Sequence, residues 1–218
     1  MNAPKHAPKQ EEDPPPYPPE PWDLRGTGYV SLWLVPRRVL PALPRGVRPV
    51  SLSGRAVVVA GFVDYRPGGL LSYHELLVAP LVRRGARVGV SVTGIWVDSA
   101  VSMAGGRELW GIPKEMAGFG MVHDPAFHGT ARVGGDLVAE ARVVRRRAGL
   151  RLPFPLRGSV WQTRGAALAR TPLRLTGRVH LARGRWHVEG PLDWLRPYRP
   201  FLTIAAADFA LRFGPRHR

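Results

Sequence analysis

The chain has 218 residues, enough for one domain with a hydrophobic core or for two very small ones. It contains no cysteine, which excludes disulfides and thiolate metal sites, and its 32 basic and 16 acidic residues give a formal net charge of +16. The longest apolar stretch, around residues 56–63, is too short to span a membrane, and the first residues lack the pattern of a signal peptide. We therefore expect a soluble, cytoplasmic protein with no membrane partner.

The first 21 residues differ in composition from the rest of the chain. They contain eight prolines and four acidic residues. Proline fixes φ and lacks a backbone N–H donor, so this segment is poorly suited to helix or sheet. The composition predicts a disordered, proline-rich tail over residues 1–21, followed by a single domain over residues 22–218.

After Gly28 most of the chain has the pattern of strands. Valine-rich and alternating apolar runs are separated by short turns that contain glycine or proline. The predicted strands cover residues 29–35, 56–65, 71–82, 87–97, 129–133, 137–145, 159–164, 174–182, 185–188 and 201–213. Arg183 and Gly184 are predicted to form the turn of a hairpin, and the last run is either one strand or a strand with a bend.

Few helices are expected. A short helix is predicted over residues 37–43, and Asp98 can cap a second one over residues 99–104 that Gly105 and Gly106 would end. The segment from there to residue 116 is predicted to be a shaped loop. Many short strands and few helices indicate a mainly β (α+β) protein, built as an antiparallel sandwich or barrel with a few short helices.

Lys114 is the most informative single residue. The chain has only three lysines, and Lys5 and Lys9 lie in the predicted tail. Arginine stays protonated, whereas a desolvated lysine can lose its proton and attack a carbonyl group. Two interpretations are open from this residue alone: an ordinary surface cation, or a nucleophile.

The segment around Lys114 resembles the acetoacetate decarboxylase-like superfamily, in which a lysine forms a Schiff base. The motif is Gly106-Arg107-Glu108 followed by Pro113-Lys114, and a Tyr-x-Glu element, Tyr73 to Glu75, lies 39 positions before the lysine. The resemblance implies an acetoacetate decarboxylase-like β-barrel or sandwich around a buried pocket. It also implies a homo-oligomer and an enzyme that needs no cofactor.

The same resemblance implies a set of site residues. Lys114 would form an iminium with a small-molecule carbonyl substrate such as a keto acid, and Glu75 would orient the substrate or shuttle a proton. Tyr73, Arg107 and Trp110 would contact the substrate. The implied activity is that of a carbon–carbon lyase of the decarboxylase, aldolase or dehydratase type. We expect the Lys114 amine to be buried, uncharged and directed at Glu75.

Three positions depart from the family pattern. Glu115 stands where the decarboxylase has a second lysine, and Thr27 and about Ala60 stand where it has an arginine and a glutamate. A carboxylate beside Lys114 would raise its pKa, and the missing arginine would otherwise hold a substrate carboxylate. These departures favour a substrate other than acetoacetate, or a non-catalytic small-molecule-binding protein on the same fold.

Other ligands are less well supported. The spacing of His74, His123 and His128 matches no common metal-ligand pattern, so no metal is expected. The basic residues are spread along the chain, with no run longer than residues 145–147. We therefore disfavour nucleic acid as a partner, although the net charge keeps it as a third hypothesis.

Overall fold

The computed structural model describes residues 15–151 and 155–217, and it confirms the mainly β class. These residues form one 14-stranded sheet, one α-helix (α1, Ala100–Trp110) and two short 3-10 helices (η1, Arg37–Val39; η2, Gly190–Leu195). The strands are β1 (Trp22–Pro36), β2 (Arg48–Pro49), β3 (Ser51–Leu52), β4 (Arg55–Tyr65), β5 (Tyr73–Arg84), β6 (Arg87–Val90), β7 (Gly94–Val97), β8 (Lys114–Met116), β9 (Gly118–Val122), β10 (Phe127–Val133), β11 (Asp136–Arg151), β12 (Leu156–Arg164), β13 (Ala167–Val188) and β14 (Leu202–Phe213).

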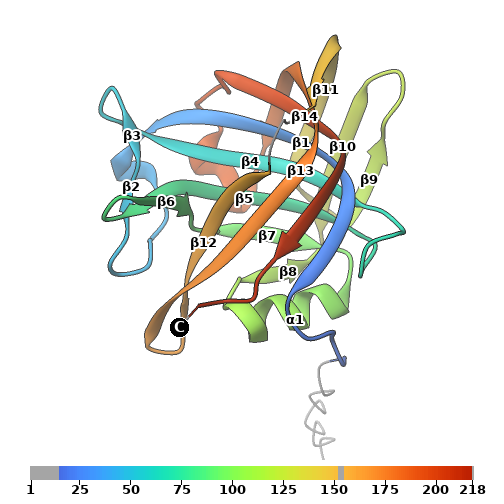
Figure 1. Ribbon diagram of the computed structural model, residues 1–218. Coiled ribbons are helices and arrows are strands. Elements are labelled where there is room, and N and C mark those ends of the chain that lie inside the picture. Colours follow the sequence, from blue (N-terminus) through green and yellow to red (C-terminus); the bar gives the residue numbers. More distant parts are fainter. Residues whose placement is uncertain (1–14, 152–154, 218) are drawn as a thin grey trace, which may run out of the picture.

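The sheet curves back on itself. Its strand order runs β12-β6-β5-β4-β1-β14-β13, and β12 also pairs with β13, so this part of the path returns to its start in a barrel-like arrangement. Beyond β13 the sheet continues through β11, β10 and β9. Figure 1 shows the long curved strands, with α1 at one end of the molecule beside β8.

Strand alternation divides the interior into two hydrophobic cores. On β4, for example, Phe62 belongs to the first core and its neighbour Val63 to the second. The first core also includes side chains of β10, β11 and η2. The second includes Trp110 at the end of α1 and Val160 of β12. The candidate site lies in this second core.

The predicted hairpin at Arg183 and Gly184 is wrong, because β13 continues through both residues. Gly184 pairs with Val143 of β11, and Ala182 pairs with Thr203 of β14. A Cβ at Gly184 would lie 2.7 Å from the Thr203 hydroxyl oxygen. Glycine is therefore required here by close packing against the neighbouring strand and does not mark a turn.

Two other strand predictions need a change of detail. The run 87–97 is divided into β6 and β7. Between them the Ser91 N–H still donates to the Pro80 carbonyl of β5, but the Val92 N–H and the Ser91 hydroxyl donate to the Gln162 side-chain oxygen. The last run does form a strand with a bend. Asp208 has a φ of 48°, and the β1–β14 register shifts where it lies.

Residues 15–21 contact the rest of the structure, whereas residues 1–14 of the predicted tail lie outside the described part. Tyr17 packs against the second core, the Trp22 indole N–H donates to the Pro18 carbonyl, and the Trp110 indole N–H donates to Glu20. Contacts thus begin before the predicted boundary at residue 22. Within the described residues, no helix has both the length and the hydropathy needed to cross a membrane.

Candidate active site

The helix that precedes Lys114 is longer than predicted. It is capped by Ser99, whose hydroxyl accepts from the Ser102 N–H, and not by Asp98, whose carboxylate accepts from the backbone N–H of His74. It ends at Gly111, which has a left-handed φ of 67°. The first half of the shaped loop predicted over residues 105–116 is therefore the second half of α1, and the rest is a short connection and β8.

Gly105 and Gly106 do not end the helix but allow two side chains to pack against it. A Cβ at Gly105 would lie 2.5 Å from the Trp22 ring, and a Cβ at Gly106 would lie 2.7 Å from Lys114 Cδ. Each glycine thus leaves room for a side chain that belongs to the site. This packing outweighs the low helix propensity of glycine.

Lys114 begins β8, and its amine is enclosed by hydrogen-bond acceptors. The residue is 4 % exposed. Its Nζ donates to Glu75 Oε2 at 2.8 Å, to Ser102 Oγ at 2.9 Å and to the Tyr73 hydroxyl at 3.3 Å. All three donors of an ammonium group therefore have a partner.

The carboxylate of Glu75 is equally well satisfied. It is 4 % exposed, and its Oε1 accepts from the Tyr65 hydroxyl at 3.2 Å while its Oε2 accepts from the Tyr73 hydroxyl at 3.4 Å. A buried ion pair is stable only when its remaining hydrogen-bonding positions are filled. The two tyrosines and Ser102 fill them here.

The expectation of an uncharged Lys114 is corrected by this pairing. Burial is the largest influence and disfavours the charge, but the Glu75 carboxylate and the Tyr73 hydroxyl together outweigh it and raise the pKa of Lys114. Glu115, on the same strand, is exposed. The stabilising carboxylate is therefore the one on β5, and the Lys114 ammonium and the Glu75 carboxylate form an ion pair.

The pair lies on the wall of a cavity of about 200 Å³. The cavity is lined by Trp22, Leu24, Val59, Tyr65, Tyr73, Glu75, Leu77, Ala79, Val90, Val92, Ile95, Trp110, Ile112, Lys114, Val160, Leu173, Leu211 and Phe213. Most of this wall is hydrocarbon. Among residues 15–151 and 155–217, the ionisable groups on it are the Lys114–Glu75 pair and two tyrosine hydroxyls.

The structure brings together four of the five predicted site residues. Tyr73, Glu75, Trp110 and Lys114 line the cavity, whereas Arg107 does not. Arg107 is exposed on α1, and its Nε donates to the Lys114 carbonyl oxygen at 2.7 Å. This places Arg107 where it can hold the β8 backbone, outside the cavity.

Sequence reasoning missed Ser102 and Tyr65. Tyr65 directly faces Tyr73 in the β4–β5 pairing, so an alignment of the two predicted strands would have placed it near Glu75. Ser102 has no such signal, because its position depends on how α1 packs against β8. Of the positions that depart from the family, Thr27 and Ala60 are buried but do not line the cavity.

The histidines considered as metal ligands lie among carboxylates. His74 Nδ1 is 2.6 Å from Asp98, and His123 Nε2 is 3.0 Å from Asp64. Across residues 15–151 and 155–217, no group of three or more histidine and carboxylate side chains is arranged to hold a metal ion. These contacts are hydrogen-bonded pairs near the surface.

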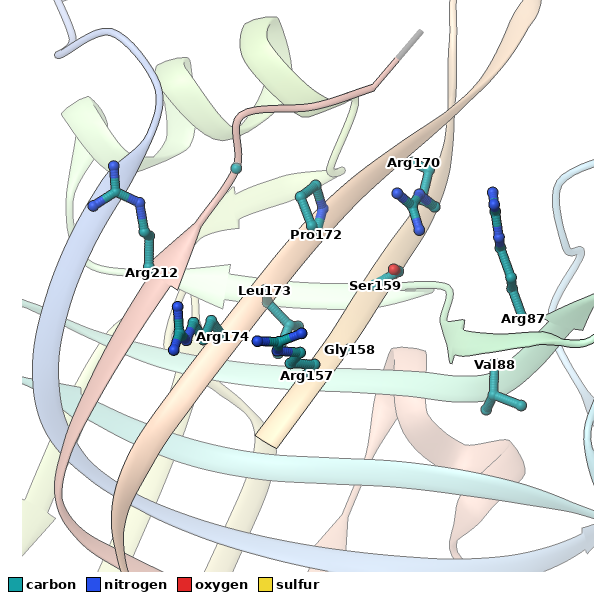
Figure 2. Close-up of a pocket in the computed structure, with 11 residues that line it drawn as sticks. Arg87, Val88, Arg157, Gly158, Ser159, Arg170, Pro172, Leu173, Arg174 and Arg212 are labelled. Atoms are coloured by element: carbon teal, nitrogen blue, oxygen red, sulfur yellow. The ribbon is translucent and has the colours of Figure 1, made fainter. Parts of the chain in front are cut away.

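Arginines gather outside the cavity. A surface pocket has a volume of about 460 Å³ and is lined in part by Arg87, Arg157, Arg170, Arg174 and Arg212. Figure 2 shows these side chains. On β14, Leu211 and Phe213 line the cavity while Arg212 between them lines this outer pocket. Strand alternation therefore separates the hydrocarbon wall from the arginines.

The arginine-lined pocket predicts weak, salt-sensitive binding of polyanions. With about four phosphates contacted, affinity for a single-stranded oligonucleotide should fall on the order of 100-fold between 50 and 200 mM salt. The double variant Arg157→Glu, Arg174→Glu should bind the oligonucleotide more weakly than wild type at 50 mM salt. Fluorescence anisotropy measures both effects, and tight binding that persists at 200 mM salt would instead favour a nucleic-acid function.

The tyrosines of the site predict a loss of stability at high pH. Burial is the larger cause and the Glu75 charge the second, and together they raise the pKa of Tyr73 to about 12. The same two causes also raise the pKa of Tyr65. Above about pH 10 the unfolded chain loses protons that the folded chain keeps, so the free energy of unfolding falls by roughly 1 kcal/mol per pH unit per group. Lys114, with its raised pKa, adds to this fall.

Urea unfolding between pH 8 and 11 measures this slope. Tyr73→Phe should reduce the slope between pH 10 and 11. Tyr198→Phe, at a residue that packs against the first core, is the matched control and should reduce it less. An identical slope in wild type and Tyr73→Phe would show that Tyr73 does not titrate as described.

Several proteins of known structure have a fold similar to that of this chain. The crystal structure of acetoacetate decarboxylase from Legionella pneumophila aligns over 99 % of this chain and 91 % of its own, at 16 % identity and a TM-score of 0.72. An acetoacetate decarboxylase-like enzyme from Sphingomonas wittichii RW1 aligns over 98 % of both chains at 17 % identity and a TM-score of 0.70. The enduracididine biosynthesis enzyme MppR, solved with pyruvate, aligns over 90 % of this chain and 88 % of its own at 20 % identity and a TM-score of 0.64.

The sequence itself gives the family assignment. No protein with a curated description matches this chain. The sequence profile of the acetoacetate decarboxylase (ADC) family, however, matches residues 2–154, which include β1 to β11 and the Lys114–Glu75 pair. On that match, the chain belongs to the acetoacetate decarboxylase family.

Proposed function

We propose that this protein is an enzyme that forms a Schiff base between Lys114 and a small-molecule carbonyl compound. The observation that carries the proposal is the buried Lys114 amine, which is 2.8 Å from Glu75 on the wall of a mainly apolar cavity. A primary amine with an adjacent proton acceptor in a dry cavity is suited to attack a carbonyl carbon. The family membership and the pyruvate-bound structure of MppR support the same chemistry.

The amine must first lose a proton, and Glu75 is placed to take it. When a carbonyl compound enters, a proton passes from Lys114 Nζ to Glu75 Oε2, and the neutral amine adds to the carbonyl carbon. The resulting alkoxide takes that proton back from Glu75, and the positively charged nitrogen of the adduct then passes its extra proton to Glu75 to give a neutral carbinolamine. Glu75 donates this second proton to the departing hydroxyl group. Water leaves, and the iminium forms beside the Glu75 carboxylate, which balances its charge.

The iminium acts as an electron sink for the next step. A bond from the adjacent carbon to hydrogen or to another carbon breaks, and its electron pair moves into the iminium to form an enamine. The Glu75 carboxylate takes the released proton, either from the C–H bond or from the hydroxyl group of a carbon fragment that leaves as a carbonyl compound. Tyr73, whose pKa is about 12, can then pass a proton to the enamine carbon and regain one from Glu75. Water then hydrolyses the iminium and releases the product and the lysine.

A non-catalytic ligand-binding protein on the same fold is the second candidate. The observation that favours it is the raised pKa of Lys114 together with three satisfied hydrogen bonds, since both stabilise the unreactive ammonium. This candidate expects ligand affinity to survive Lys114→Ala nearly unchanged. The Schiff-base proposal expects the covalent product to disappear.

Reductive trapping distinguishes the two. The protein is incubated with a panel of ketones and aldehydes and with borohydride, and the adduct is located by mass spectrometry of peptides. We expect an adduct at Lys114 that is absent in Lys114→Arg. Lys5 and Lys9 serve as internal controls for non-specific labelling, so an adduct at all three lysines, or none with any carbonyl compound, would contradict the proposal.

A further inference from the structure

The cavity around Lys114 carries information about the charge of its ligand. Of the side chains that line it, only Tyr65, Tyr73, Glu75 and Lys114 offer polar groups beyond the two tryptophan N–H donors. Both tryptophan N–H groups donate to acceptors that do not line the cavity. The Trp22 N–H donates to the Pro18 carbonyl, and the Trp110 N–H donates to the Glu20 carboxylate. The rest of the wall is hydrocarbon, contributed by several strands, for example by Val59 on β4 and Leu211 on β14.

The charge inside the cavity is already balanced. The Lys114 ammonium is paired with Glu75, and an iminium at the same nitrogen would carry the same single positive charge beside the same carboxylate. A carboxylate on the substrate would add a second negative charge with no cation to meet it. Burying an unpaired carboxylate costs several kcal/mol.

No arginine of the described residues lines the cavity to supply that cation. Arg174 and Arg212 lie on the outer face of β13 and β14 (Figure 2), and Arg107 is exposed on α1. The net charge of the chain is +16, yet among the described residues Lys114 is the one basic side chain that lines the cavity. Attraction of anions to the surface is therefore separate from recognition in the site.

The size of the cavity limits the rest of the ligand. At about 30 Å³ for each water-sized group, a cavity of about 200 Å³ holds a compound of about six to eight non-hydrogen atoms. One carbonyl oxygen can meet Lys114 and Tyr73, and the remaining atoms must lie against hydrocarbon. A branched or straight alkyl chain fits this wall.

We infer that the substrate is a neutral, mainly hydrocarbon ketone or aldehyde and not a keto acid. This inference rests on the proposed function for the covalent step, but the charge preference of the cavity is a separate property. This charge preference favours reactions of neutral carbonyl substrates, such as aldol cleavage, dehydration or α-proton exchange. It disfavours loss of carbon dioxide, which needs a substrate carboxylate.

A matched pair of compounds tests the inference. 5-Methyl-2-hexanone and 4-oxopentanoate have the same number and arrangement of non-hydrogen atoms and differ in an isopropyl group against a carboxylate. At equal concentrations with borohydride, we expect at least 10-fold more adduct at Lys114 with the neutral ketone. Equal trapping, or a preference for the keto acid, would overturn the inference and leave the proposed function intact.

A second measurement separates the two claims. If neither compound is trapped at Lys114, the proposed function fails, and non-covalent binding of the same pair then decides the inference. Trp22 and Trp110 line the cavity, so ligand entry should change tryptophan fluorescence. A dissociation constant at least 10-fold lower for the ketone supports the inference, and one equal to or higher than that of the keto acid overturns it.

Discussion

Lys114→Met should reduce the free energy of unfolding by about 3–5 kcal/mol, because it leaves the Glu75 carboxylate buried without a counter-charge. The side chain of Glu75 is 5 % exposed, and no other cation is within salt-bridge distance of it among the described residues. Tyr65 and Tyr73 still donate to the carboxylate, but two neutral donors do not replace a cation. Urea unfolding at pH 8 measures the loss.

The double variant Lys114→Met, Glu75→Gln should recover most of that stability, because neither charge then remains. Glu115→Gln on the exposed side of β8 is the matched control and should change the free energy of unfolding by less than about 0.5 kcal/mol. The effect of Lys114→Met alone should also shrink at pH 5. An unpaired buried carboxylate has a raised pKa, so the folded single variant takes up a proton there that the unfolded chain does not. A single variant as stable as wild type, or a double variant no more stable than the single, would contradict the pairing.

How much of the site could be predicted from the sequence is clearest at Lys114. Its uniqueness suggested a role, but its contact with Glu75 across 39 positions came from family resemblance and not from any local pattern. Its charge was predicted wrongly, since the balance between burial and a carboxylate depends on how closely β5 and β8 approach. Sequence patterns give no such distance.

The fold shows the same division between local and long-range information. Valine-rich runs such as β4 were located from their composition and the turn residues that follow, to within a residue at each end. Glycines were misread at Gly184 and at Gly105–Gly106, where the sequence pattern of a turn or helix stop occurs inside a continuous element. At these positions the glycine is required by a side chain from elsewhere in the chain, and only the tertiary structure reveals that side chain.

The two adjacent glycines of α1 allow the position of the reactive amine to be tested apart from the stability of the fold. In Gly106→Ala the new methyl group would lie 2.7 Å from Lys114 Cδ and 2.9 Å from Cε, so the lysine side chain must shift. Alanine also improves helix propensity by up to about 1 kcal/mol, which offsets part of the crowding. Because a displacement of about 1 Å can slow a positioned reaction by about 100-fold, we expect the rate of adduct formation at Lys114 to fall 10- to 100-fold.

Gly105→Ala is the matched comparison, with the same chemical change one residue earlier in the helix. Its methyl group would lie 2.5 Å from the buried Trp22 ring, which cannot move aside as a lysine side chain can. Overpacking of about 1–3 kcal/mol should therefore appear as lost stability, with adduct formation by the folded protein changed less than in Gly106→Ala. Thermal unfolding and the borohydride trapping rate are measured for both variants. If Gly106→Ala traps a ketone as fast as wild type, the position of the Lys114 amine against α1 does not limit the reaction, and the role assigned to this packing is wrong.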